Sequence, residues 1–204
     1  MGLGNWIVSR CVSEVDESRL VAEAPTDYVL RLAEAKARAA VHGSPGSAFI
    51  VAADTAVVDG EHVLGKPANS EDAVHMLRQL RRRTHQVFTG LAVLDPGSGQ
   101  IVTDVCVTAV PMRDYTEAEI GAYVASGDPL DKAGAYGIQH AGFHPVQNMA
   151  GCYASVMGLP LCHLLRLLDR LQAAPQPDLP ERCQTHLSYA CPVSNAILRG
   201  EPVG

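Results

Sequence analysis

One carboxylate inside an apolar run constrains the fold of this chain more than any other feature. The stretch SAFIVAADTAVV, residues 47–58, is largely apolar and has Asp54 in its middle, which predicts a buried β-strand. Asp59-Gly60 follows directly and a further apolar stretch comes next, which is typical of a hairpin. A carboxylate in such a strand is costly to bury unless it is paired or bound to a metal. Asp54 is therefore either a hydrogen-bonded structural residue or a catalytic or metal-binding one.

Helices and strands are both expected in the rest of the chain. Apolar residues at helical spacing predict helices over residues 24–43, 69–83, 115–127 and 159–174. Apolar runs between turn residues predict strands over 85–95 and 100–112, and a short strand over 135–139. Because hairpin strands are mixed with helices, we expect an α/β sandwich with a mixed sheet.

Residues at the predicted helix starts fit capping preferences. Thr26 and Ser70 are each followed by acidic residues, and Thr116-x-x-Glu119 has the spacing of a capping box. The run Arg81 to Arg83 is expected to end the second helix, where basic side chains complement the helix dipole.

The segment from Gly60 to Lys66 has the spacing G-x-x-x-x-G-K of a nucleotide-binding phosphate loop. Such a loop needs a Ser or Thr after the lysine and a helix that starts at once. Here Pro67 follows, and the next helix is expected only near Ser70. A hairpin with an exposed Lys66 accounts for most of this pattern, so we set the phosphate loop aside.

Three further charged residues lie at unusual places. Lys36 shares a helix face with apolar residues, so it is expected to point inward. Asp131 and Lys132 lie in a loop with glycines on both sides, where a ligand can approach closely. Each one alone is explained by a solvated charge. Together with Asp54 and Lys66 they indicate a site for phosphate and metal.

Composition excludes several classes of function. The formal net charge of −6 provides no general field for binding nucleic acid. No apolar run is long enough to span a membrane, and the first residues do not resemble a secretory signal. The six cysteines form no C-x-x-C pair, which favours reduced thiols in a cytoplasmic protein over a disulfide framework. Cys183, His186 and Cys191 are spaced poorly for zinc.

Four stretches carry a resemblance to a known family. They are AADTAVVDGEHVLGKP, MLRQLRRRTHQVFTGLAVLD, YVASGDPLDKAGAYGIQ and GCYASVMGLPL. In order and spacing they resemble the Maf family, septum-formation-inhibitor-like nucleotide pyrophosphatases, from about residue 12 to residue 168. The resemblance implies an elongated α/β fold with a central mixed sheet, helices on both sides and a cleft between two lobes.

The resemblance also implies an activity. Maf-like proteins are nucleoside triphosphate diphosphatases, hydrolases that act on acid anhydrides and release a monophosphate and pyrophosphate with the help of Mg²⁺ or Mn²⁺. The segments ADT and DKAGAYGIQ are similar to the branch that acts on dTTP, UTP and related modified pyrimidine nucleotides. A housecleaning role in the cytoplasm is implied, with a nucleotide as partner and a homodimer as one expected assembly, and with no nucleic acid or membrane partner.

Site residues follow from the matching positions. By resemblance, Asp54 is the general base and Glu17 a metal-side carboxylate. Lys36 and Lys66 hold phosphate oxygens, and Thr55 and Gln139 select the base. Asp131 and Lys132 line the same cleft.

The N-terminus departs from the family pattern. The family begins with a strand that leads into S-x-S-P-R-R, and nothing in residues 1–18 matches this motif. We expect a Maf-like domain over residues 1–172 whose N-terminal strand and phosphate-binding motif are truncated, followed by a Pro-rich, flexible tail over 173–204. Two hypotheses remain open: an active pyrimidine nucleotide pyrophosphatase, and a weak or inactive Maf-like domain that binds nucleotides or acts as a scaffold.

Overall fold

A four-stranded β-sheet forms the centre of the molecule. The computed structural model describes residues 14–43, 48–173 and 178–204. The sheet has the order β2-β1-β3-β4, built from β1 (Ile50–Asp59), β2 (His62–Leu64), β3 (Thr84–Leu94) and β4 (Ile101–Pro111). All three strand pairs of this described sheet are antiparallel. Within the described residues the sheet is therefore antiparallel, whereas a mixed sheet was expected. The connection through α2 starts and ends at the same end of the sheet, so β3 runs opposite to its neighbour β1.

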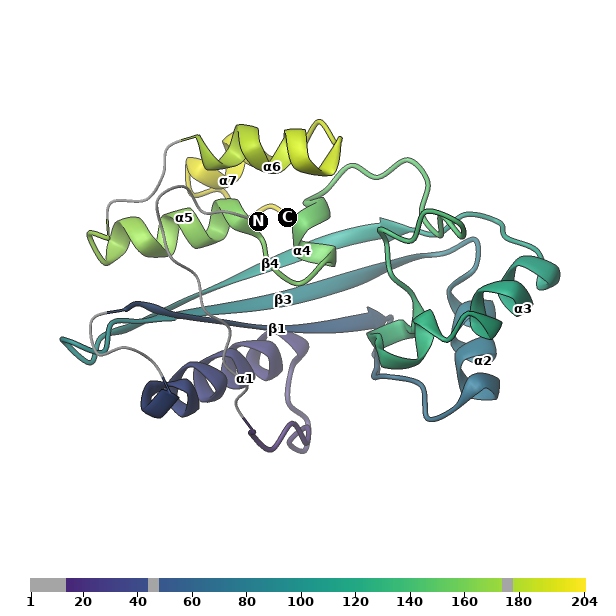
Figure 1. Ribbon diagram of the computed structural model, residues 1–204, viewed down its shortest axis with the longest axis horizontal. Coiled ribbons are helices and arrows are strands. Elements are labelled where there is room, and N and C mark those ends of the chain that lie inside the picture. The colour runs from purple at the N-terminus through teal and green to yellow at the C-terminus, as the bar shows by residue number, and fades with distance from the viewer. Residues whose placement is uncertain (1–13, 44–47, 174–177) are drawn as a thin grey trace.

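Helices cover both faces of the sheet and one of its ends (Figure 1). Helix α1 (Pro25–Ala39) lies on one face. On the other face lie α4 (Tyr153–Val156) and α5 (Leu161–Arg170), with α6 (Leu179–Leu187) and α7 (Ser194–Leu198) outside them. Helices α2 (Ser70–Leu80) and α3 (Glu117–Ala125) form a second lobe at the end of the sheet. The elongated, two-lobed α/β arrangement is therefore confirmed.

The hydrophobic core is divided into clusters, one in the lobe of α2 and α3 and others on the two faces of the sheet. Leu77, Val110, Tyr115 and Ile120 belong to the cluster that joins α2 and α3 to the end of the sheet. A second cluster packs α5 against β3 and β4, and a third packs α1 against β1 and β3. The sheet is thus covered by packed helices on both sides.

Local sequence signals were partly correct. The hairpin at Asp59-Gly60 is present, with Asp59 opposite His62 and Gly60 at φ +62°. The capping box of Thr116 and Glu119 is also present. Two helix caps were predicted one or two residues late. Ala24 precedes α1, which starts at Pro25, and the Asn69 side chain, rather than that of Ser70, caps α2.

Two expected features of secondary structure differ from the observed ones. Residues 135–139 form no strand. A short 3-10 helix, η3 (Ala133–Ala135), precedes Tyr136, and Gly134 within it has φ +69°. Helix α2 ends at Leu80, so the three arginines after it lie beyond the helix and form ion pairs instead: Arg81 with Glu117, Arg82 with Asp114 and Arg83 with Asp59. Neither outcome is visible in local sequence patterns, because both depend on contacts with distant segments.

The segment for which we expected a flexible tail contains two helices. Helix α6 starts with Leu179 and Pro180, both buried, and Ile197 of α7 is completely buried. Leu179 joins the cluster around α5, and Ile197 packs with Cys106 and Cys162. At the end of the chain, Gly204 lies against the backbone of Val107. Regular structure therefore extends beyond residue 172.

Two remaining expectations concern the termini and the membrane. The loss of the N-terminal strand and phosphate-binding motif was predicted from residues 1–18, and residues 1–13 of that stretch lie outside the described part of the chain. In residues 14–43, 48–173 and 178–204, none of the helices combines the length and the apolar character needed to cross a bilayer.

Candidate active site

An ammonium group held between two carboxylates marks one half of the candidate site. Lys36 Nζ lies 2.6 Å from Asp54 Oδ1 and 2.7 Å from Glu17 Oε1. Asp54 comes from the middle of β1 and Lys36 from α1, 18 residues earlier in the chain. The Lys36 and Asp54 side chains are 21% and 11% exposed, whereas that of Glu17 is 55% exposed. The inward orientation predicted for Lys36 is thus confirmed, and the largely buried carboxylate of Asp54 is paired.

The pKa values of this group show how burial and pairing compete. Burial raises the pKa of Asp54, and the hydrogen bond from Lys36 only partly opposes the rise. Burial would lower the pKa of Lys36, but its hydrogen bonds and attraction to Asp54 and Glu17 outweigh that effect and raise it. A carboxylate with a raised pKa, held by a lysine that stays charged, is suited to accept a proton at neutral pH.

Thr55 projects from the opposite face of β1, because successive side chains of a strand alternate. Its Oγ1 lies 3.0 Å from Oγ1 of Thr89 on β3, and Thr89 Oγ1 donates to the carbonyl oxygen of Ser155 at 2.9 Å. This chain of hydrogen bonds connects β1 and β3 with α4. It fixes Thr55 at the rim of a pocket.

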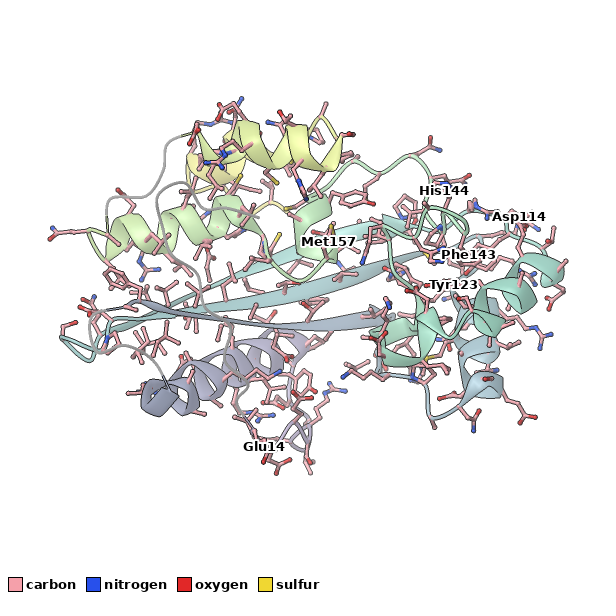
Figure 2. All side chains as sticks on the ribbon, in the orientation of Figure 1. Glu14, Asp114, Tyr123, Phe143, His144 and Met157 are labelled. Atoms are coloured by element: carbon pink, nitrogen blue, oxygen red, sulfur yellow. The ribbon has the colours of Figure 1, made fainter. Side chains whose placement is uncertain are left out.

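The pocket beside Thr55 has a volume of about 310 Å³. Lys66, Lys132 and Gln139 line it together with apolar side chains and the backbone at Gly137 and Gly158. Met157, labelled in Figure 2, lines the pocket from the end of α4. A few polar groups within an apolar wall are typical of a small-molecule site.

The two halves are joined around one edge of β1. The strand β2 pairs with β1 only from Val57 to Asp59, so the edge from Ile50 to Ala56 pairs with no strand in the described chain. Lys66, which lines the pocket, is also close enough to Glu17 to lower the pKa of that carboxyl, after the larger effect of the hydrogen bond from Lys36. A ligand that crosses this edge can therefore reach both halves.

Lys132 is held by its own loop. Its Nζ donates to the carbonyl oxygen of Asp128 at 2.7 Å and to carboxylate oxygens of Asp128 and Asp131 at 3.1 and 2.8 Å. Asp131 itself is largely exposed and is absent from the pocket wall. The structure thus brings Lys132 into the pocket and leaves Asp131 at its outer side, as a partner of Lys132.

The carboxylates fit a divalent cation that arrives with a phosphate ligand. Glu17 and Asp54 both reach the same ammonium group, so they lie on one side of the site. Mg²⁺ is often bound by one or two carboxylates and completes its shell with water and phosphate oxygens. Among the residues that the structure describes, no three His, Cys, Asp or Glu side chains are grouped as a metal site. This excludes the weak zinc pattern at Cys183 and His186 within the described chain.

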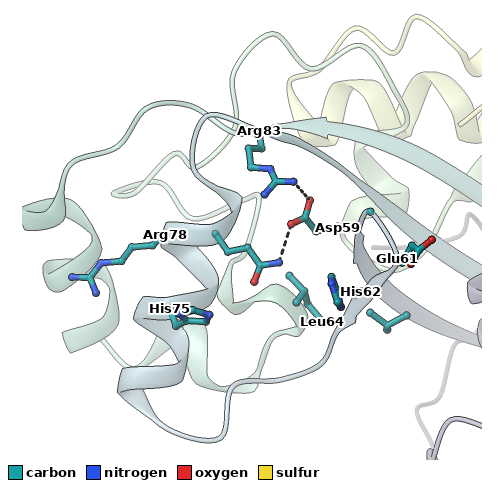
Figure 3. A pocket seen from close by; sticks show the side chains of 10 residues that line it. Asp59, Glu61, His62, Leu64, His75, Arg78 and Arg83 are labelled. Atoms are coloured by element: carbon teal, nitrogen blue, oxygen red, sulfur yellow. Dashed lines mark hydrogen bonds and ion pairs between the residues drawn. The ribbon is translucent and has the colours of Figure 1, made fainter.

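A larger hollow lies elsewhere, between α2 and the β1–β2 hairpin (Figure 3). Its volume is about 940 Å³, and its buried carboxylate, Asp59, is already bound by Gln79 at 2.8 Å and Arg83 at 3.1 Å. None of the three lysines of the chain lines it. We therefore place the candidate site at Asp54 rather than in the larger hollow.

Some residues of the site could not be found from the sequence. Thr89 and Asp128 act through hydrogen bonds to Thr55 and Lys132, and no motif singles them out. The spacing of four residues between Asp128 and Lys132 is the one available signal. The other predicted residues lie in two groups: Glu17, Lys36 and Asp54 form one, and Thr55, Lys66, Lys132 and Gln139 line the pocket.

Comparison with known proteins identifies the family. Residues 2–171 match the family model described as Maf-like protein. The chain belongs to the Maf family. A protein of Dehalococcoides mccartyi is 40% identical over 171 residues, which cover 84% of this chain and 76% of that protein. Proteins of Geotalea uraniireducens and Escherichia coli O157:H7 are each 44% identical, over 78% and 80% of this chain and 82% of their own length. All three relatives are named dTTP/UTP pyrophosphatase.

Proposed function

We propose that this Maf protein hydrolyses dTTP and UTP to the monophosphate and pyrophosphate. One observation carries the proposal: the largely buried carboxylate of Asp54 is paired with Lys36 at the edge of β1 that pairs with no described strand, beside a pocket lined by the other two lysines of the chain. The name of its relatives, dTTP/UTP pyrophosphatase, supports the same substrates.

The placement of the lysines supports a triphosphate that crosses the edge of β1. The chain has only three lysines, and a triphosphate carries several negative charges in a protein whose net charge is −6. Lys36 contacts Glu17 at 2.7 Å, and the charge of Lys66 also lowers the pKa of Glu17. As point charges they would hold phosphate oxygens near Asp54, while the base enters the pocket on the other face of the strand.

The reaction assigned to Asp54 is proton transfer from water. The oxygen of a water molecule attacks the α-phosphorus, the bond to the oxygen between the α- and β-phosphorus breaks, and pyrophosphate leaves. Asp54 takes the proton that the attacking water loses. Lys36 donates to Asp54 Oδ1 and keeps the carboxylate ionised despite its burial.

A divalent cation has one role in this scheme. Bound Mg²⁺ or Mn²⁺, held by Glu17 and phosphate oxygens, supplies positive charge that offsets the charge on the leaving pyrophosphate. Glu17 is the more exposed of the two carboxylates, so it can exchange its contact with Lys36 for a cation at a small cost.

Selection of the base is assigned to Gln139 and Thr55. The amide of Gln139 has a donor and an acceptor, which suits the edge of a pyrimidine. Thr55 is held by Thr89 and offers a short polar side chain at the rim of the pocket. Lys132, held by Asp131 and Asp128, lines the same pocket wall.

The experiment is a measurement of pyrophosphate release with Mg²⁺ or Mn²⁺. The substrates are dTTP, UTP, CTP, GTP, 7-methyl-GTP and modified pyrimidine triphosphates, and Asp54→Asn is the control. Release from dTTP and UTP that is at least about a hundredfold slower in the control supports the proposal. Preference for a purine triphosphate contradicts the assigned substrates. No release from folded protein that still binds dTTP in calorimetry supports a nucleotide-binding domain instead.

A further inference from the structure

A buried tyrosine lies behind the pocket and touches two of its parts. Tyr123 belongs to α3 and is 3% exposed. Its hydroxyl donates to Asp128 Oδ2 at 2.6 Å and accepts from the backbone N–H of Gly137 at 2.9 Å. Asp128 holds Lys132, and Gly137 lines the pocket. The hydroxyl of Tyr123 therefore connects Asp128, which binds Lys132, with the pocket wall at Gly137.

The direction of these two hydrogen bonds is fixed by chemistry. A backbone N–H can only donate, so the oxygen of Tyr123 accepts from Gly137, and its single hydrogen is left for Asp128. Burial, and then the bond to Asp128, raise the pKa of Tyr123, so the hydroxyl keeps its proton at neutral pH. Burial opposes ionisation of Asp128, but the hydrogen bonds from Tyr123 and Lys132 outweigh it, and the pKa of Asp128 is lowered.

The carboxylate of Asp128 is divided between two partners. Its Oδ2 accepts from Tyr123 and its Oδ1 accepts from Lys132 Nζ at 3.1 Å. A carboxylate group is planar, so fixing one oxygen also fixes the direction of the other. Tyr123 thereby determines where the ammonium group of Lys132 is held relative to the pocket.

The second partner of Tyr123 lies under the same lysine. A methyl group placed on Gly137 would come within 3.1 Å of Lys132 Cε and 3.6 Å of Gln139 Nε2. The side chains of Lys132 and Gln139 thus pass close to the backbone that Tyr123 holds. The hydroxyl of Tyr123 therefore affects Lys132 in two ways, through Asp128 and through the backbone of Gly137. Through Gly137 it also affects the neighbouring side chain of Gln139.

The ring of Tyr123 is fixed independently of its hydroxyl. It stacks on Phe143 with the ring centroids 4.2 Å apart and the planes at 15°. Its centroid lies 4.7 Å from that of the His140 ring. Figure 2 shows Tyr123 and Phe143 close together in the lobe formed with α3. A variant that lacks only the hydroxyl can therefore keep the ring in place.

The structure assigns Tyr123 a positioning role: through Asp128 and Gly137 it sets the places of Lys132 and Gln139 in the nucleotide pocket. This role rests on the proposed function, because it concerns how the pocket binds its substrate. Tyr123 lines neither the pocket nor the group around Asp54, so it acts only through the residues that it holds. Its effect is expected on binding more than on the chemical step.

The test compares Tyr123→Phe with Tyr115→Phe. Tyr115 is equally buried, contacts the same Phe143 ring, and donates its hydroxyl to the carbonyl oxygen of Leu77, away from the pocket. We expect Tyr123→Phe to raise KM for dTTP about tenfold while kcat changes less than about threefold. Tyr115→Phe should leave KM unchanged. Equal KM values in wild type and Tyr123→Phe, or the same rise in both variants, would overturn the inference.

A second measurement does not depend on turnover. The three lysines can be acetylated with a succinimidyl ester, and the rate at each can be followed by mass spectrometry. We expect the rate at Lys132 relative to Lys66 to rise about threefold in Tyr123→Phe, rise further in Asp128→Asn, and stay constant in Tyr115→Phe. An unchanged or lower relative rate in folded Tyr123→Phe overturns the positioning role. Failure of wild type to cleave or bind dTTP contradicts the proposed function separately, while the labelling still decides whether Tyr123 positions Lys132.

Discussion

Asp54 on β1 lies directly opposite Gly90 on β3, and the absence of a side chain at Gly90 lets α1 approach the sheet there. A methyl group at Gly90 would come within 2.5 Å of the carbonyl oxygen of Val29 in α1. The same helix carries Lys36, which reaches Asp54 at 2.6 Å. The glycine is therefore part of how the fold brings an ammonium group to a buried carboxylate.

Gly90→Ala is expected to destabilise the protein by about 2 kcal/mol or more, because the added methyl meets helix backbone rather than a flexible side chain. The denaturant midpoint and the m-value measure this change. Gly121→Ala is the matched control, since Gly121 lies in α3 with no atom near the added methyl. It should be neutral or slightly stabilising. Equal free energies of unfolding for the two variants would show that α1 does not pack closely against Gly90.

Asp54→Asn is expected to lower kcat for dTTP by about a hundredfold to ten-thousandfold, the usual range for loss of a general base. Lys36 keeps Glu17 as a partner, so the free energy of unfolding should change by less than about 1 kcal/mol. Steady-state kinetics and urea unfolding measure the two effects. A variant with full activity would remove Asp54 from the mechanism.

The pH dependence of the wild type follows from the same residue. Only the ionised form of Asp54 can accept a proton, and burial raises its pKa above the ordinary value of 3.8. As pH falls through that raised pKa, log(kcat/KM) should decline with a slope of one. Asp54→Asn should lack this limb. The same limb in the residual activity of the variant would assign it to another group.

How far sequence alone predicts this molecule depends on the range of the interactions. The hairpin at Asp59-Gly60 and the capping box at Thr116 are local, so a few neighbouring residues suffice to predict them. The segment 135–139 looked like a strand because Tyr136 and Ile138 are apolar, but they are buried by packing in the α2–α3 lobe rather than by a strand pair. Buried Leu179 and Ile197 likewise depend on contacts with distant parts of the chain.

The candidate site shows the same division. The motif around Asp54 was recognisable, and Lys36 could be placed on the inner face of its helix from helical spacing. The contact between them joins residues 18 positions apart, and the link from Tyr123 to Gly137 joins residues 14 apart. Sequence spacing carries no information on such contacts unless the packing of helix and sheet is known.

Gln139→Ala is expected to change the order of preference among dTTP, UTP, CTP and GTP more than it changes the fastest rate. The amide is assigned to the edge of the base, whereas Lys36, Lys66 and Asp54 are assigned to the phosphates. Measurement of kcat/KM for the four nucleotides checks this. An unchanged order would count against a role of Gln139 in selection.

Acid should destabilise the protein through His85. This residue is 2% exposed, and its Nε2 lies 2.7 Å from the hydroxyl of Tyr136. Burial lowers the pKa of His85 from 6.5 to about 4, although nearby Asp59 opposes the shift. The unfolded chain binds a proton at pH 6.5 and below, which the folded protein does not bind until about pH 4. Stability therefore falls as pH decreases across this window, by about 3 kcal/mol in total.

His85→Gln separates this effect from those of other groups. Its absolute stability at pH 7 is not the readout, because the substitution also changes packing. The readout is the loss of stability between pH 6.5 and 4, which should be about 3 kcal/mol smaller than in the wild type. Identical pH profiles of the two proteins would show that His85 is not the responsible group.

The most direct measurement is product analysis of dTTP turnover in ¹⁸O-labelled water with Mg²⁺, for wild type and Asp54→Asn. Attack of water on the α-phosphorus predicts dTMP that carries the label and unlabelled pyrophosphate, with both products formed at least about a hundredfold more slowly by the variant. Labelled pyrophosphate, or dTDP with orthophosphate, would place the attack at another phosphorus. Either of these results, or no product from folded wild type, would contradict the account.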